Sequence, residues 1–222
     1  MAIAVATAES STDSGASPHQ ILMPASVASG DLLLAIVDRD AAGGNGTLTV
    51  PTDWTELVQN NTASFHLRYA VWYKVSDASE GADEDFATSI VDSSAHHCYR
   101  ITGQHASTAP AISTLVSGTD TAPDAGSFNP SWGSEETLWI TGFFMRDPRS
   151  VSAVPTGYTQ HPDGVVGADG SRVASAYKVA TADSDDPAAW TIAVGGGTWY
   201  AWTIAVRAAA SNTPIIFKFA VG

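Results

Sequence analysis

Cysteine is nearly absent from this chain, which has one, Cys98, among 222 residues. A single thiol excludes any intramolecular disulfide. Cys98 lies in the segment Ala95–Ile101, whose apolar residues on either side favour burial. We therefore predict a packed, unpaired thiol and no disulfide framework.

Basic residues are also scarce, with 10 lysines and arginines against 23 acidic residues and a formal net charge of −13. The three lysines are Lys74, Lys178 and Lys218. Because binding to nucleic acid phosphates requires clustered lysine and arginine, nucleic acid is not an expected partner.

Long apolar runs are missing as well. No stretch approaches the roughly 20 apolar residues that cross a bilayer. Residues 1–8 lack the basic start and the long apolar run of a secretory signal. We expect no membrane association and no signal peptide.

Motifs for catalysis, metals and cofactors are not found in the sequence. It contains no Gly-x-Ser-x-Gly elbow, no His-Glu-x-x-His and no Cys/His pair with zinc spacing. His96 and His97 are adjacent, so a strand places them on opposite faces, where they cannot grip one ion together. The glycines of 195–197 are followed by neither lysine nor a helical pattern. We therefore predict no catalytic residue, no cofactor, no metal and no enzymatic activity.

Acidic side chains gather in two corresponding turns. They are Glu80, Asp83, Glu84 and Asp85 in the first, and Asp183, Asp185 and Asp186 in the second. Calcium favours such oxygen-rich turns, but neither has the Asp-x-Asp-x-Asp-Gly order with a distant glutamate. The favoured interpretation is a solvated turn, and calcium binding stays an open alternative.

The sequence does contain an internal repeat. Val50-Pro-Thr-Asp-Trp-Thr55 returns as Val154-Pro-Thr-Gly-Tyr-Thr159, and the pattern of residues 68–75 returns at 172–179, always 104 residues later. The same offset pairs further apolar positions, Leu34 with Leu138, Ile36 with Ile140, Phe86 with Trp190 and Ile90 with Val194. This self-similarity indicates one structural unit used twice.

Strand and turn patterns fill both units. Leu32–Val37 is a short apolar run between turn residues, typical of a strand buried on both faces. We predict an all-β protein, an antiparallel β-sandwich that is jelly-roll-like, with residues 1–222 forming one sandwich from two related halves, about 28–103 and 132–208. Residues 214–220 would add a C-terminal strand. Two small β-sandwich domains are the alternative.

Residues 63–75 alternate over the longest stretch. Leu67, Tyr69, Val71, Tyr73 and Val75 are expected to face the core. Arg68, Trp72 and Lys74 then lie on the opposite face, where an aromatic ring between cations suits a docking surface. Carbohydrate stacking on an exposed tryptophan, Trp72 or Trp132, is the alternative use of these aromatics.

Three segments in succession carry a resemblance to a known family. They are Gly30-Asp-Leu-Leu-Leu-Ala35, Pro51-Thr-Asp-Trp-Thr55 and Tyr73-Lys-Val75, and the second half adds Pro155-Thr-Gly-Tyr-Thr159 and Ala201–Arg207. Over residues 20–208 the chain resembles a diffuse family of β-sandwich proteins of tailed bacteriophages, prophages and some bacterial surfaces, with GDLLLA, PxGWT and YKVA segments. Asp53 departs from this pattern, which has the glycine that Gly157 retains.

The resemblance implies a virion component without enzymatic activity. The first expectation is a capsid decoration or cement protein, assembled in the host cytoplasm and docking on the major capsid protein. By analogy with other capsid decorators we expect a homotrimer. A tail, fibre or receptor-binding module and a bacterial surface adhesin that binds carbohydrate are the alternatives.

Overall fold

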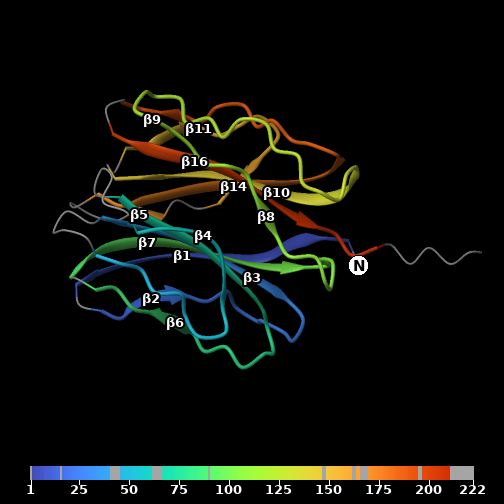
Figure 1. The fold of residues 1–222 in the computed structure, drawn as a ribbon, viewed down its shortest axis with the longest axis horizontal. Helices are drawn as coiled ribbons and strands as arrows, with labels where there is room; N and C mark the ends of the chain where they lie inside the picture. Colours follow the sequence, from blue (N-terminus) through green and yellow to red (C-terminus); the bar gives the residue numbers. More distant parts are fainter. Residues whose placement is uncertain are drawn as a thin grey trace, which may run out of the picture.

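The computed structural model describes residues 2–15, 17–40, 46–61, 67–89, 91–146, 149–161, 164–165, 170–194 and 197–210. Within these residues every regular element is a strand, and every pairing is antiparallel. The all-β prediction is therefore confirmed. Figure 1 shows two large sheets lying one above the other.

The first sheet has the strand order β1-β7-β3-β5-β4. Its strands are β1 (Ala4–Gly15), β7 (Asp92–Thr102), β3 (Leu32–Asp40), β5 (Leu67–Val75) and β4 (Thr55–Asn60). The second sheet has the order β12-β14-β10-β16-β8, with β13 added on β14 and β9 on β16. Its strands are β12 (Thr159–Gln160), β13 (Gly164–Val165), β14 (Arg172–Ala182), β10 (Glu135–Met145), β16 (Trp199–Arg207), β8 (Ala111–Ile112) and β9 (Val116–Gly118).

The central core lies between the two sheets. The first sheet contributes Leu34, Ile36, Tyr69, Val71 and Tyr99, among others, and the second contributes residues such as Leu138, Ile140, Phe144, Trp202 and Ile204. Tyr69 stacks on Phe144 across this interface, with ring centroids 4.8 Å apart. Because residues from both halves of the chain build this one core, the two sheets form a β-sandwich.

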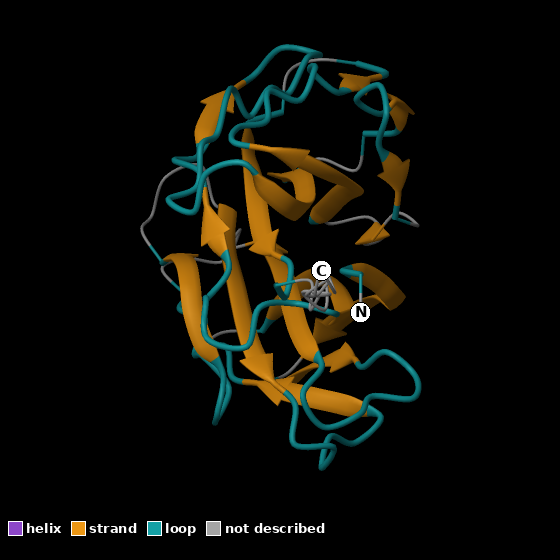
Figure 2. Ribbon diagram, turned by 90° about the vertical axis from the view of Figure 1, so that its right-hand side faces the viewer, coloured by secondary structure: helices purple, strands orange, loops and turns teal. Residues whose placement is uncertain are grey.

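Each sheet is also covered on its outer face. Leu33, Ala35 and Trp72 of the first sheet pack against Ile21 and Phe86, which belong to the two-stranded sheet of β2 (His19–Leu22) and β6 (Asp83–Phe86). The second sheet buries Trp139, Phe143 and Met145 against Trp190 and Ile192, beside the pair β11 (Val151–Ala153) and β15 (Thr191–Ile192). Figure 1 shows β2 and β6 on the side of the first sheet that faces away from the second sheet, and Figure 2 shows that the regular elements are all strands.

These layers explain why the central strands are apolar on both faces. In β3, Leu34 and Ile36 face the central core, whereas Leu33, Ala35 and Val37 face the outer cover. All nine residues of β3 are buried. The prediction that Leu32–Val37 is a strand buried on both faces is confirmed.

Each large sheet takes its strands from one half of the chain only. A jelly roll distributes the strands of its Greek keys over both sheets, so the jelly-roll-like topology is not confirmed. The two sheets do have corresponding orders, with β12, β14, β10 and β16 in the places of β4, β5, β3 and β7. The duplication itself stays a prediction.

Local geometry at the repeated positions agrees in detail. Thr55 pairs with Tyr73, and Thr159 pairs with Tyr177. Asp53 has φ of 66° and Gly157 has φ of 83°, in turns closed by 3.2 Å hydrogen bonds to Pro51 O and Pro155 O. In the last strand of each unit the offset is 107 instead of 104, since Tyr99 pairs with Leu34 and Val206 pairs with the equivalent Leu138.

Residues 188–194 contain only a short strand, Thr191–Ile192, and Trp190 beside it turns inward against Phe143. The predicted strand at 214–220 lies outside the described residues, as do His66 and Ile90.

Candidate functional site

The predicted docking face of Arg68, Trp72 and Lys74 is not a surface of the folded chain. These residues do lie opposite the central core, as alternation requires, but the outer cover encloses them. Trp72 is fully buried and donates from Nε1 to Gln59 Oε1 at 3.0 Å. Arg68 is buried and donates to the Gly46 and Leu67 carbonyls. The expected exposure of Arg68 and Trp72 is therefore wrong, because alternation along a strand says nothing of a second layer.

Lys74 retains limited exposure and belongs to a repeated arrangement. Its Nζ lies 3.1 Å from Glu80 Oε1 and 6.0 Å from the centre of the Trp54 ring. The equivalent Lys178 pairs with Asp185, and its Nζ lies 4.6 Å from the centre of the Tyr158 ring. Each lysine thus ties an acidic loop to the aromatic residue that closes an outer core.

A cluster of polar side chains is buried between the two sheets. The Oγ of Ser175, on β14, lies 2.6 Å from His97 Nδ1 and 2.6 Å from Tyr99 Oη, both on β7. His161, which follows β12, stacks on His97 with ring centroids 4.2 Å apart and contacts Tyr99 edge-on. The backbone N of His161 donates to Ser175 O at 2.9 Å. We call these four residues the interface cluster.

Burial decides the protonation of the interface cluster. The pKa of His97 is held well below its ordinary value, first by burial and then by the neighbouring His161, His96 and Arg172. Burial raises the pKa of Tyr99, so this phenol stays protonated. Tyr99 can therefore donate to Ser175, which in turn donates to a neutral His97.

A hydroxyl beside a neutral imidazole has the geometry of a nucleophile and its base. Here both groups are enclosed, with Ser175 1% and His97 0% exposed. In this conformation the hydrogen bonds join one sheet to the other and do not open to solvent. No local pattern in the sequence indicates this cluster, because Ser175 and His97 are 78 residues apart.

Charged residues gather at the end of the sandwich where β3 and β10 finish. The buried Asp38 accepts hydrogen bonds at Oδ2 from the backbone N of Met145 and of Arg172, at 3.2 and 3.0 Å. Burial raises the pKa of Asp38 well above its ordinary value, and these backbone donors oppose the rise. Asp40 pairs with Arg146 at 3.4 Å nearby.

The adjacent histidines lie on opposite faces, as predicted. His97 faces the second sheet, whereas His96 faces the outer cover and meets Phe86 edge-on at 5.3 Å. His96 bonds Ser94 Oγ at 2.7 Å and Ser11 Oγ at 3.1 Å. Cys98 is buried and unpaired, as predicted, and burial raises the pKa of its thiol.

The acidic side chains of the two turns do not come together at one point. Glu80 interacts with Lys74 and Ser76, and Asp185 interacts with Lys178 and Tyr158. Asp83 and Asp85 belong to strand β6. Among the residues that the structure describes, no three histidine, cysteine or acidic side chains come together as a metal site. Calcium binding by these turns has no geometric support there.

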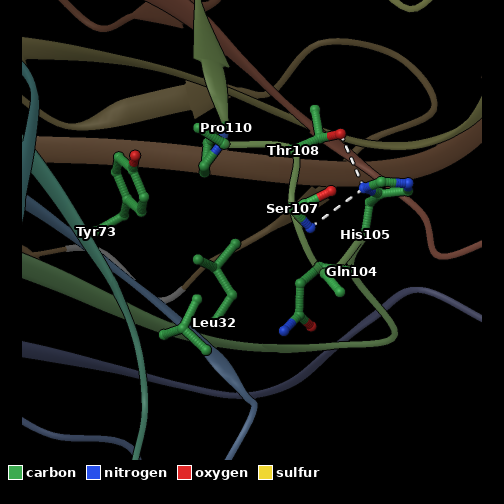
Figure 3. A pocket seen from close by; sticks show the side chains of 10 residues that line it. Leu32, Tyr73, Gln104, His105, Ser107, Thr108 and Pro110 are labelled. Atoms are coloured by element: carbon green, nitrogen blue, oxygen red, sulfur yellow. Dashed lines mark hydrogen bonds between the residues drawn. The ribbon is translucent and has the colours of Figure 1, made fainter.

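A pocket of about 210 Å³ opens at the other end of the sandwich (Figure 3). Leu32 and Tyr73 line one side, together with Val75, and residues 104–110 form the opposite wall. His105 Nδ1 accepts hydrogen bonds from Thr108 Oγ1 at 2.8 Å and from the Ser107 backbone N at 3.4 Å. These hydrogen bonds hold residues 105–108 in a turn, which forms part of the pocket wall.

Of the two tryptophans considered for carbohydrate stacking, Trp72 is buried and cannot form a platform. Trp132 is half-buried and donates from Nε1 to Thr137 Oγ1 at 3.0 Å.

The described residues include no helix that is long and apolar enough to span a membrane. Comparisons with protein-family models, curated proteins and solved structures gave no match.

Proposed function

We propose that this chain is a structural protein of a tailed-phage virion without enzymatic activity. Its most specific form is a capsid decoration protein that docks on the major capsid protein as a homotrimer. In the sequence, the proposal rests on the resemblance of the Gly30–Ala35, Pro51–Thr55 and Tyr73–Val75 segments to the phage β-sandwich family.

One structural observation supports this use of the resemblance. The residues that carry it hold the sandwich together. Gly30 has φ of 89°, which favours glycine, and Asp31 Oδ2 accepts from the Ala28 N at 2.8 Å and from Arg100 Nε at 2.6 Å. Trp54 closes an outer core. A family defined by scaffold residues predicts such roles for these positions.

The buried polar groups support a scaffold as well. Asp38 and Ser175 both connect one sheet to the other from inside the molecule. A protein that assembles into a shell needs a rigid body whose loops and edges meet its neighbours. We place the contacts with capsid protein on those loops and edges, since the outer face around Trp72 is already covered.

The experiment is to follow the tagged chain through particle purification from the cells that produce the phage. In a density gradient the chain should migrate with filled heads, and cryo-electron microscopy of those heads should show extra density with three-fold symmetry. The free chain run on the same gradient is the control for self-association. Recovery of the chain only in particle-free fractions would contradict the proposal.

The same preparation distinguishes the tail alternative. Heads and tails are separated, and a decoration protein remains with the heads. Recovery with isolated tails would favour a tail or fibre module. Binding on a glycan array, together with absence from particles, would favour the adhesin.

A further inference from the structure

We propose that the pocket walled by residues 104–110 is the docking site for the last residues of the same chain, 211–222. This inference does not depend on the proposed virion role. It concerns how the chain closes its own apolar surface at one end of the sandwich.

The pocket offers apolar surface that the chain leaves open. Leu32 and Tyr73 line it beside Val75, which is 56% exposed although it is a large aliphatic residue. Ala106, Ala109 and Pro110 line the loop side. Removing this surface from water would be favourable in proportion to its area.

The size of the pocket restricts its occupant. A volume of about 210 Å³ is below the roughly 300 Å³ at which sites for drug-sized ligands begin. The space fits one large side chain with its backbone better than a cofactor. An aromatic or branched aliphatic side chain is the chemistry that its lining would take.

The last described residues of the chain lie beside the loop that forms one wall of the pocket. The His105 backbone N donates to Arg207 O at 2.8 Å, and the Ala209 N donates to Gly103 O at 2.8 Å. Residues 207–209 therefore run beside the loop that walls the pocket. Ala210, the last described residue, follows directly.

The remaining sequence has the required chemistry. Residues 211–222 lie outside the described residues and read Ser-Asn-Thr-Pro-Ile-Ile-Phe-Lys-Phe-Ala-Val-Gly. Two phenylalanines and two isoleucines follow Pro214, and Lys218 carries the only charged side chain. A lysine is suited to a chain whose net charge is −13.

Distance favours the chain's own segment over a second copy. Phe217 comes seven residues after Ala210, and a chain of seven residues spans at most about 24 Å when extended. That reach covers the neighbouring loop. A short tether gives an effective concentration in the millimolar range, which a second copy in dilute solution does not reach.

The test uses the full chain with two new cysteines, Ser107→Cys on the exposed rim of the pocket and Lys218→Cys between the phenylalanines. The native Cys98 is buried and its thiol pKa is raised, so it reacts slowly. A short bis-maleimide should join the two new cysteines within one chain, which peptide mass spectrometry and a monomer band detect. A dimer band or no cross-link would overturn the proposal.

Two matched controls keep the result specific. Thr119→Cys replaces Ser107→Cys at an exposed position beside the Gly118–Trp199 pair, at the far end of β16, and should give no cross-link within the chain. Val75→Glu places a charge at the pocket and should slow the internal cross-link by about tenfold. Val179→Glu is the comparison, since Val179 is 45% exposed but does not line the pocket. Equal rates for the two glutamate variants would contradict the proposal.

Discussion

The Asp38 carboxyl on β3 accepts a hydrogen bond of 3.0 Å from the backbone N of Arg172 on β14, so one buried side chain joins the two sheets. A second bond, from the Met145 N, reaches the same oxygen. The connection crosses the interface at a point where neither strand can pair with the other. It carries a cost, because burial opposes the charged form of the carboxyl.

Asp38→Asn is therefore expected to keep the fold and to stabilise it at pH 8. The amide oxygen can still accept both backbone bonds, and no charge has to be buried. The pKa of Asp38 is raised in the folded state. The stability that Asp38 contributes to the folded chain is therefore fully present below the unfolded pKa of about 3.9, and it is lost as the pH rises through the folded pKa. Urea unfolding at pH 5 and pH 8 should show a gap between variant and native chain that widens with pH.

Asp38→Ala provides the contrast. It leaves two buried N–H groups without acceptors, at a cost of about 1–3 kcal/mol each. If Asp38→Asn and Asp38→Ala lowered the free energy of unfolding equally, the hydrogen bonds from the Met145 and Arg172 backbone N would not explain how Asp38 stabilises the chain.

His96 predicts the opposite dependence on pH. Burial lowers the pKa of His96 to about 3, with a further contribution from His19. The unfolded imidazole binds a proton at about pH 6.5, so stability falls by about 1.4 kcal/mol per pH unit from there down to pH 3. Unfolding free energies measured at pH 7, 6 and 5 should fall less steeply in His96→Gln than in the native chain, and equal slopes would contradict this prediction.

Gly142→Ala should destabilise the second sheet strongly. A Cβ at this position would lie 2.4 Å from the Ala174 carbonyl oxygen and 2.5 Å from the Trp202 ring. The backbone oxygen cannot move without breaking the sheet, so we expect a loss of about 3 kcal/mol or more. Gly81→Ala, where the nearest contact would be 3.6 Å, should be close to neutral in the same thermal unfolding assay.

Trp72→Ala separates a structural role from a docking role. The buried ring packs on Phe86 with centroids 5.6 Å apart, so its removal should cost about 3–5 kcal/mol of unfolding free energy. Lys74→Ala should also destabilise the chain, because the side chains of Lys74 and Glu80 are only 13% and 2% exposed and the Glu80 carboxylate would lose its cation. A stable Trp72→Ala chain that failed only in particle binding would restore the docking face.

Much of the scaffold could be predicted from sequence because its signals are local. The alternation of residues 67–75 and the apolar run at 32–37 gave the right strands, and the Pro51 and Pro155 turns gave the right repeated geometry. The jelly-roll-like topology was not confirmed, since strand spacing does not tell which strands share a sheet.

The candidate sites could hardly be predicted. Ser175 and His97 form a pair only because β14 and β7 face each other, and a separation of 78 residues leaves no pattern to detect. The pocket beside Leu32 likewise combines the start of β3, the end of β5 and the loop that follows β7.

By itself, the sequence determined the all-β class, the strands buried on both faces and the unpaired buried thiol. Each of these follows from neighbouring residues, whose periodicity records how many faces of a strand avoid water. Only the tertiary structure decided that Arg68 and Trp72 lie beneath a second layer, and that Asp38 and Ser175 connect the sheets. Burial and long-range hydrogen bonds depend on which segments meet in space, and that is a property of the packed chain.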